Sequence, residues 1–502
     1  MRDKWVFLLA LLVVSPLPDG DFAKCSADEF TLINQQGEEE TLEAELMGSD
    51  KDWHALALPD GRYRVVQQAA VRKRVPKAGP APMTGKEIAL ELEREYGSDK
   101  FRYDVLDSYV VGLVLSTPLP KTSEGRAKKV LDNATQFMKR VEKAFSTFLK
   151  EAGIESLKPR YPQVMLIFET DLEFDAYAEK ITQQRGLQSA MIAGFYSPIT
   201  NHLAIRLEEC SNFETPFHEA IHQQVYNRGL LQRLAPVPQW FDEGIATGFE
   251  GNGKIVTQPT KVSPRYARQA LRTNRMTWDE MHADDTVFRT GESVSEAYGQ
   301  AWGLHWLLVT KYRPEYKKYL KTLNDKPAMG NDTPSERMAD FSAAFKKTLP
   351  EMEKEFPDTL QLAAKKQKVS LDPAKPVGIS LTESNLGKVT MTAVSVNGTL
   401  RLEGKLENIS PLRPMSFVVL VLVGDGTYSA WFQDKVGIQK TVPLEVQIPT
   451  ERFPGADASG QPGTYRVQVM SAPSDHPIAE KWREKRGFTD LTTRRGSRTS
   501  GR

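Results

Sequence analysis

The first half of the chain alternates between helical and extended patterns of apolar residues. Between Glu124 and Glu151 the apolar side chains recur every three or four positions, as Val130, Ala134, Phe137, Val141, Phe145 and Phe148. This period predicts an amphipathic helix. The short apolar runs Val164–Phe168, Ile192–Tyr196 and Leu203–Leu207 predict three strands. We therefore expect a mixed sheet packed beside a long helix.

A second amphipathic helix is predicted just after these strands. Thr215 suits its N-cap, Pro216 suits the first helical position, and Gly229 suits its C-terminal end. Apolar residues spaced four apart give the helix a face to bury, and these are Phe217, Ile221 and Val225.

Two more helices follow. Pro236 and Pro238 favour an extended connector, after which Trp240–Glu250 is predicted as a helix. Gly244 should let this helix approach the preceding one closely. A further helix is predicted over Ser295–Tyr312.

Beyond about residue 372 the helical period gives way to regularly spaced strands. The expected strands are Val389–Val396, Thr399–Leu406, Phe417–Val423, Tyr428–Phe432, Val442–Ile448 and Tyr465–Met470. Asn397-Gly398 between the first two is a strong hairpin signal. We expect residues 371–475 to form an immunoglobulin-like β-sandwich. Residues 476–502, which are rich in Arg, Gly and Ser, are expected to be a basic disordered tail.

The N-terminal part is also extended in character. Alternation over Leu42–Leu46 and the runs Trp53–Leu58 and Tyr63–Val66 predict a small β module over residues 24–71. Prolines and glycines make residues 72–86 a predicted linker. The helices and strands described above then belong to a domain of residues 87–370.

Composition adds a location and excludes some partners. Arg2 and Lys4 precede the ten-residue apolar run Trp5–Val14, which is typical of a signal peptide and too short to span a bilayer. We expect residues 1–23 to be that signal and the protein to be periplasmic or extracellular. A net charge of +1 over 502 residues gives no electrostatic argument for nucleic acid or for an anionic membrane, and no other segment approaches a membrane span.

The chain has two cysteines, Cys25 and Cys210, and neither has metal-ligand spacing. Lys24 stands where a lipid-attachment signal needs a small residue, so lipidation is not expected. In an oxidising compartment the two thiols could pair, or Cys210 could be a small buried residue.

The principal chemical motif is H-E-A-I-H over residues 218–222. Residues four apart lie on one face of a helix, so the imidazoles of His218 and His222 can bind one metal ion. Glu219 points about 100° away around the helix, where it can face a metal-bound water as general base. Zinc in a hydrolase usually has three protein ligands and one open position. We expect one zinc ion per chain.

The third ligand is expected twenty-one residues after the second histidine. Glu243 is the candidate, with Asp242 and Glu214 as competitors. The alternative is that Glu243 is a solvated acid in the first turn of its helix, where the helix dipole favours it.

These two motifs resemble the gluzincin metallopeptidases, in particular the compact peptidase-MA-like proteins of exported bacterial chains. The resemblance rests on H-E-x-x-H and on W-F-x-E-G-x-A over residues 240–246, and it covers roughly residues 86–370. It implies an α+β, zincin-like core with His218, His222 and Glu243 as zinc ligands and Glu219 as base. One departure concerns thermolysin-type enzymes, which carry asparagine before the ligand acid and aspartate four residues after it. Here those positions hold Asp242 and Thr247.

Two further groups are candidates for stabilising the charge that develops on the substrate oxygen. Tyr298 and His305 share a face of the predicted Ser295–Tyr312 helix. A phenol hydroxyl near the metal can stabilise an oxyanion. Both residues could equally be packing residues of that helix.

The sequence thus predicts an exported zinc peptidase between two β modules, acting on a peptide or protein substrate. Gluzincins bind their substrate along an edge strand, and Leu203–Leu207 is the candidate for it here. Two alternatives share the same residues. One is a catalytically inactive binding or scaffold protein, although such a protein has no chemical need for Glu219. The other is a zinc hydrolase of non-peptide amide bonds.

Overall fold

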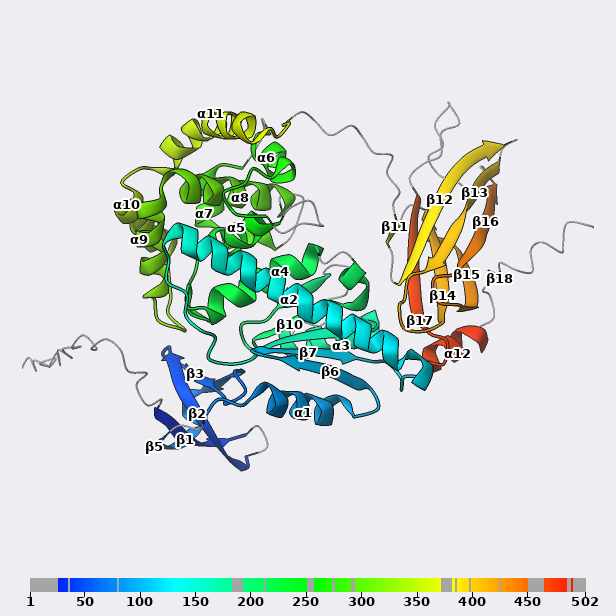
Figure 1. The fold of residues 1–502 in the computed structure, drawn as a ribbon, viewed down its shortest axis with the longest axis horizontal. Helices are drawn as coiled ribbons and strands as arrows, with labels where there is room; N and C mark the ends of the chain where they lie inside the picture. Colours follow the sequence, from blue (N-terminus) through cyan, green and yellow to red (C-terminus); the bar gives the residue numbers. More distant parts are fainter. Residues whose placement is uncertain are drawn as a thin grey trace, which may run out of the picture.

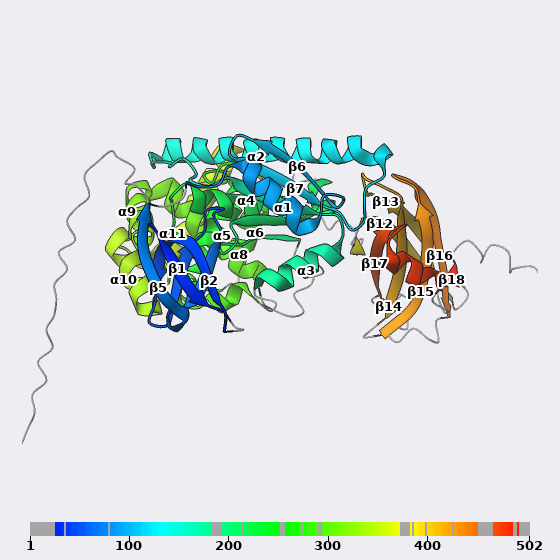
Figure 2. The same ribbon diagram turned by 90° about the horizontal axis from the view of Figure 1, so that it is seen from below.

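The computed structural model describes most of the chain between residues 26 and 490 (Figures 1 and 2). The described ranges are 26–34, 37–78, 81–182, 193–211, 214–250, 257–272, 276–289, 294–371, 382–383, 386–396, 399–423, 426–449, 465–484 and 489–490. These residues form a mixed α+β protein with several sheets and twelve α-helices. The predicted signal peptide and Cys25 lie outside the described residues. None of the described helices is long and apolar enough to cross a membrane.

The N-terminal part is a five-stranded antiparallel sheet in the order β4-β3-β2-β1-β5. Its strands are β1 (Ser26–Ile33), β2 (Glu39–Ser49), β3 (Trp53–Ala57), β4 (Tyr63–Gln67) and β5 (Val71–Ala78). The prediction of a linker over 72–86 was therefore wrong in its first half, because β5 completes the sheet. Pro76 is compatible with a strand here because β5 is at the edge, where the missing N–H breaks no ladder.

This N-terminal sheet is attached to the central domain by specific contacts. The Tyr63 N–H donates to the Ile199 carbonyl at 2.6 Å. The guanidinium of Arg233 lies 3.7 Å from the centre of the Tyr63 ring and donates to the Gly61 carbonyl at 2.8 Å. The sheet is therefore held directly against the loop that joins two strands of the central domain.

The central domain is built on a five-stranded sheet in the order β6-β7-β8-β10-β9. Its strands are β6 (Phe101–Leu106), β7 (Tyr109–Val114), β8 (Gln163–Phe168), β9 (Gly194–Tyr196) and β10 (His202–Arg206). Strands β7, β8 and β10 are parallel, and the two outer strands run antiparallel to their neighbours.

Alternating side chains cover the two faces of this sheet with different helices. Met165 and Ile167 of β8 pack with the long helix α2 (Glu124–Ala152), which confirms the predicted helix. Val164 and Leu166 point to the other face and pack with α1 (Gly85–Tyr96) and α3 (Asp171–Thr182). Burial on both faces explains why these strands are almost continuously apolar.

The sheet topology contradicts one expectation about the substrate. Strand β10 pairs with β8 on one side and with β9 on the other, so the segment Leu203–Leu207 has no free edge. Among the described strands, β9 occupies that edge of the sheet. The prediction failed because β9 is only three residues long and precedes β10 in the chain, yet in the sheet it pairs with the outer side of β10. Ile192, the predicted start of β9, lies outside the described residues.

Helices dominate the chain from the metal-motif region to residue 367. They are α4 (Glu214–Asn227), α5 (Gln239–Phe249), α6 (Pro264–Ala270), α7 (Trp278–Ala283), α8 (Val294–Lys311), α9 (Arg313–Asn324), α10 (Pro334–Phe345) and α11 (Leu349–Gln367). Helix α8 is buried along most of its length and packs against α5 and α6. The predicted Ser295–Tyr312 helix is thus confirmed. It lies at the centre of this helical layer.

The C-terminal part contains two sheets, in the orders β11-β17-β14-β15-β18 and β12-β13-β16. The strands are β11 (Thr382–Glu383), β12 (Gly387–Val396), β13 (Thr399–Asn408), β14 (Met415–Val423), β15 (Gly426–Val436), β16 (Thr441–Pro449), β17 (Tyr465–Pro473) and β18 (Thr489–Asp490). All six predicted strands are present. The Asn397-Gly398 turn lies outside the described residues, but Val396 pairs with Thr399 as a hairpin requires.

The first part of the predicted disordered tail is ordered. Residues Pro477–Glu484 form helix α12, and Arg483 binds Asp434 of β15 at 2.9 Å. This ion pair and the contact of Trp482 with Phe432 fix the segment to the sheet. The composition of the tail did not predict this helix, because its apolar residues are few and are interspersed with charged ones.

A buried ion pair joins the C-terminal part to the central domain. Arg413 Nε lies 2.8 Å from Glu169 Oε1, and the two side chains are 2% and 0% exposed. Arg413 also donates to Thr117 Oγ1 at 2.6 Å and to the Thr117 carbonyl at 3.0 Å. Burial raises the pKa of Glu169 to about 7, and the opposing charge of Arg413 limits the rise. The pair therefore depends on both partners being present.

We predict that Glu169→Gln lowers the free energy of unfolding by about 3 to 5 kcal/mol, because the guanidinium of Arg413 would stay buried without a counter-charge. Chemical denaturation measures the change. Asp132→Asn is the control, since it breaks an exposed pair with Lys128 within helix α2 and should cost at most about 1 kcal/mol. Equal, small losses in both variants would contradict a structural role for the buried pair.

Candidate metal centre

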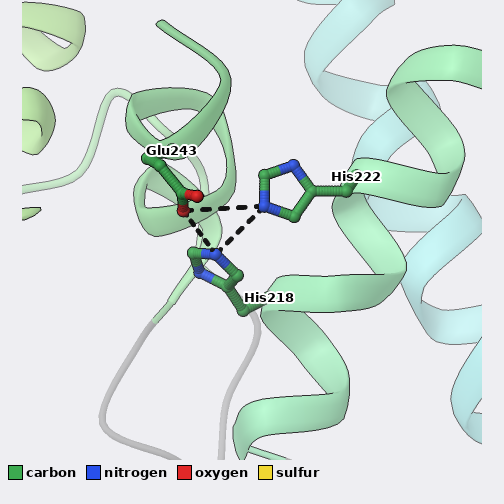
Figure 3. Close-up of side chains that lie close together, drawn as sticks. All are labelled: His218, His222 and Glu243. Carbon is green, nitrogen blue, oxygen red and sulfur yellow. Dashed lines mark hydrogen bonds and ion pairs between the residues drawn. The ribbon is translucent and has the colours of Figure 1, made fainter. Parts of the chain in front are cut away.

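Two helices bring the candidate ligands together. Helix α4 carries His218 and His222 on one face, and helix α5 presents Glu243 to them from the opposite side (Figure 3). Helix α4 begins at Glu214, one residue before the predicted cap. Gly229 adopts a left-handed φ of 74° just beyond its end, as expected for a helix-terminating glycine.

The three candidate ligand atoms lie within bonding reach of a single ion. His218 Nε2 is 2.9 Å from Glu243 Oε2 and 3.1 Å from His222 Nε2, and His222 Nε2 is 3.7 Å from Glu243 Oε2. Tetrahedral ligands at about 2.0 to 2.1 Å from zinc are about 3.3 to 3.4 Å apart. The observed separations bracket that value, so the donor set fits a small tetrahedral cation. Among the described residues, His218, His222 and Glu243 are the group of histidine and acidic side chains whose ligand atoms lie close enough together to hold one metal ion.

The remaining imidazole nitrogens contact carboxylates. His218 Nδ1 lies 2.7 Å from Glu250 Oε1, and His222 Nδ1 lies 3.1 Å from Asp242 Oδ1. Each contact is satisfied when the Nδ1 carries its proton and Nε2 keeps its lone pair for the metal. Asp242, a competitor for the third ligand position, therefore lies behind a histidine and outside the ligand group. The side chain of Glu214 lies outside the described part of the chain.

The two supporting carboxylates are themselves held in place. Tyr266 OH donates to Glu250 Oε2 at 2.5 Å, and Tyr226 OH donates to Asp242 Oδ2 at 2.9 Å. On the ligand acid, Gln239 Nε2 donates to Glu243 Oε1 at 2.7 Å. The orientation of all three candidate ligands is thus fixed by hydrogen bonds from neighbouring helical residues.

The electrostatics of the group favour a bound cation. Burial alone would lower the pKa of His218, but its hydrogen bonds to Glu243 and Glu250 raise the pKa to about 10. The pKa of His222 is likewise raised, against the effect of burial, mainly by Asp242. The pKa of Glu243 is lowered because the hydrogen bonds from both histidines outweigh its burial. The cluster of carboxylates therefore stabilises positive charge between the ligand atoms.

Glu219 lies beside the ligand group without belonging to it. Its Oε2 accepts a hydrogen bond from the Tyr196 N–H of edge strand β9 at 2.9 Å. Burial raises the pKa of Glu219, and the nearby charges of His218 and His222 oppose that effect. A carboxylate in this position can face the open side of the ligand group.

Tyr298 and His305 occupy different surroundings on α8. The Tyr298 ring centre lies 6.0 Å from that of His218, and burial together with the charges of Glu243 and Glu219 raises the pKa of its hydroxyl. His305 is buried away from the ligand group, with Nε2 3.1 Å from Tyr316 OH. The structure therefore brings Tyr298 to the candidate site and places His305 in the helical core.

A close helix contact sets the position of α5, although not the one expected. A Cβ on Gly244 would lie 2.8 Å from the Ala301 carbonyl oxygen and 2.9 Å from His305 Cβ. Gly244 therefore allows α5 to approach α8, whereas the sequence suggested an approach to α4. The spacing of residues on α5 explains this, because Gly244 points about 100° away from Glu243 around the helix.

Glu250, Tyr266 and Gln239 support the candidate ligands, and these roles were not predicted from the sequence. Glu250 stands seven residues after Glu243, an interval that places both acids on one face of the predicted Trp240–Glu250 helix, although α5 ends at Phe249 and Glu250 is its extended cap. That spacing was a signal that could have identified Glu250. Tyr266 belongs to a separate helix, and no local pattern pointed to it.

Comparisons with known proteins cover this region. The model of a family described as a protein of unknown function (DUF1570) matches residues 212–329, which include His218, Glu219, His222, Glu243 and Tyr298. No match was found among the curated proteins.

Two solved structures from Clostridium perfringens are similar to the chain. One is the ZmpB metallopeptidase, with 11% identity and a TM-score of 0.28, covering 86% of this chain and 89% of that one. The other is the M60 catalytic domain of ZmpC in complex with the sialyl T antigen, with 11% identity and a TM-score of 0.29, covering 89% and 91%. At these identities and TM-scores the likeness is distant and assigns no function to this chain.

Proposed function

We propose that this protein is an exported zinc-dependent peptidase of the gluzincin type. The observation that carries the proposal is the convergence of His218 Nε2, His222 Nε2 and Glu243 Oε2 at separations that suit one tetrahedral ion. A protein that only binds a metal structurally usually surrounds it with four protein ligands. Three ligands with an acid beside them are instead the composition of a hydrolytic site.

The metal would be held by His218, His222 and Glu243. When bound, zinc would polarise the scissile carbonyl and lower the pKa of a coordinated water toward about 7. Glu250 and Asp242 keep both histidines in the tautomer that leaves Nε2 free for the ion. The two carboxylates also make Nε2 of each imidazole a stronger electron-pair donor to the metal. Their negative charge balances that of a divalent cation.

Glu219 would act as the proton carrier. It would take a proton from the attacking water as the oxygen–carbon bond forms, and it would give that proton to the nitrogen as the carbon–nitrogen bond breaks. The raised pKa of this partly buried carboxyl suits both uptake and release of the proton. The hydrogen bond from the Tyr196 N–H holds the carboxylate next to the edge strand.

Tyr298 would stabilise the negative charge that develops on the carbonyl oxygen. Its hydroxyl keeps its proton at neutral pH, since burial and the nearby Glu243 and Glu219 carboxylates raise its pKa. A protonated phenol close to the ligands can donate a hydrogen bond to that oxygen. His305 is not needed for this role.

The arrangement of the sheet suggests how a substrate would lie. Strand β9 is the edge strand beside Glu219, and backbone groups at a sheet edge can pair with an extended peptide. We infer that the peptide lies along β9. We also infer that residues 87–370 form the gluzincin-like domain, that the C-terminal sheets form an immunoglobulin-like sandwich, and that residues 1–23 direct export.

The first prediction concerns the metal. Purified protein should carry about one zinc per chain by elemental analysis, and a His218→Ala, His222→Ala double variant should carry none. Glu250→Gln keeps all three ligands, yet it should weaken zinc affinity by about tenfold to a hundredfold in a chelator competition, because it weakens the contact to His218. Normal zinc content in the double variant would rule out this site.

The second prediction separates binding from catalysis. Glu219→Gln should retain zinc and lose peptide hydrolysis by at least about a hundredfold, because an amide cannot accept and return the proton. Hydrolysis of a mixed peptide library, with and without a chelator, provides the assay. A variant as active as the parent would reassign the base. A parent that holds zinc but cleaves no peptide would favour a non-peptide amide substrate or a binding protein.

The third prediction concerns Tyr298. Tyr298→Phe deletes only the hydroxyl, so the protein should remain folded and zinc-loaded. Both kcat and kcat/KM should fall about a hundredfold to a thousandfold, as expected for an interaction made only in the transition state. His305→Gln is the comparison variant and should leave both kcat and kcat/KM close to those of the parent, because His305 lies away from the ligand group. Kinetics of Tyr298→Phe equal to those of the parent would make Tyr298 a packing residue.

A further inference from the structure

The outer face of helix α2 carries a row of unpaired cations. Arg126, Lys129, Arg140, Lys143 and Lys150 are all exposed, and they occur at spacings that keep them on one helical face. Among the described residues, no ion pair or hydrogen bond is found that involves the charged side-chain group of any of the five. The row extends over twenty-five residues of helix, from Arg126 to Lys150, or about 36 Å.

The acids of the same helix do not neutralise this row. Glu124 binds Arg102 at 2.8 Å, Asp132 binds Lys128 at 2.9 Å, and Glu142 pairs with Arg228 on the buried side. Glu151 lies at the very end of the helix, beyond the last cation. Among the positions between the cations, Asn133, Gln136 and Thr147 are exposed and uncharged, and Asp132 lies at the margin of the face with its charge paired to Lys128.

The row is also open to an extended partner. Figure 2 shows α2 running straight along the outside of the molecule, with the sheet and the other helices on its inner side. Its inner face packs on the core through Phe137, Phe145 and Phe148. A ligand on the outer face would therefore leave the candidate metal centre free, because that centre lies beneath the opposite side of the helix.

We propose that this face of α2 binds a linear anionic polysaccharide. A straight, single-file row of cations matches a chain whose negative charges also repeat along a line. The exposed amides of Asn133 and Gln136 lie within the row, and they can hydrogen bond to sugar hydroxyls.

Other anionic partners fit the row less well. A membrane surface would favour apolar anchors beside the cations. The described large apolar residues that are exposed, Trp53, Leu157, Leu172 and Leu362, all lie outside α2. Single-stranded nucleic acid is usually held by aromatic side chains on which bases stack, and this face has none.

The test measures binding of the full-length protein to size-defined heparin fragments at two salt concentrations. The parent should bind, and its affinity should fall as salt rises. The triple variant Lys129→Gln, Arg140→Gln, Lys143→Gln should lose at least about tenfold in affinity, since three of the five charges are removed. Its circular dichroism and zinc content should match those of the parent, because the three side chains do not contact the core.

A second triple variant controls for overall charge. Lys354→Gln, Lys365→Gln, Lys366→Gln removes the same number of charges from exposed positions on α11 and should change affinity by less than about twofold. An equal loss in both variants, or no binding by the parent, would overturn the proposal. Tighter binding to anionic vesicles or to DNA than to heparin, lost in the α2 variant, would also overturn it in favour of that partner.

Discussion

The candidate metal centre depends on one constraint: an oxygen of the Glu243 carboxylate must lie within 4 Å of the Nε2 atoms of His218 and His222. A single helix suffices to place His218 next to His222, but Glu243 comes from a second helix. The second helix must therefore be positioned to within a fraction of an ångström. Gly244 lets α5 rest directly on the backbone of α8, and the hydrogen bond from Gln239 fixes the carboxylate itself. Close packing in the helical layer is thus what makes the ligand geometry possible.

The same constraint concentrates charge in a buried place. Three carboxylates, those of Asp242, Glu243 and Glu250, surround two histidines in a region that is largely shielded from water. Buried charges are costly unless they are compensated. Tyrosine hydroxyls compensate part of this charge by donating hydrogen bonds, and a divalent cation at the Nε2 atoms would compensate the rest. The supporting residues and the ligands therefore form one electrostatic unit.

The two outer β parts are attached to the central domain through buried cationic side chains. Arg233 reaches the N-terminal sheet, and Arg413 reaches back from the C-terminal sheets to Glu169. The first of these contacts lies at the loop between β9 and β10, close to the strand that binds Glu219. The N-terminal sheet is thus in contact with the loop that follows β9, the strand whose backbone binds Glu219.

The sequence alone determined the features that depend on local spacing. The His218–His222 pair follows from a four-residue interval on a helix, the long helix from an apolar period of about 3.6, and the central strands from short, almost continuous apolar runs. Glu243 was also identified, although its contact with the histidines is long-range. Tertiary structure alone decided which strand lies at the sheet edge, which face of α5 meets α8, and that Tyr266 holds Glu250 against His218. These outcomes depend on contacts between segments far apart in the chain, and local sequence patterns carry no information about which distant surfaces will meet.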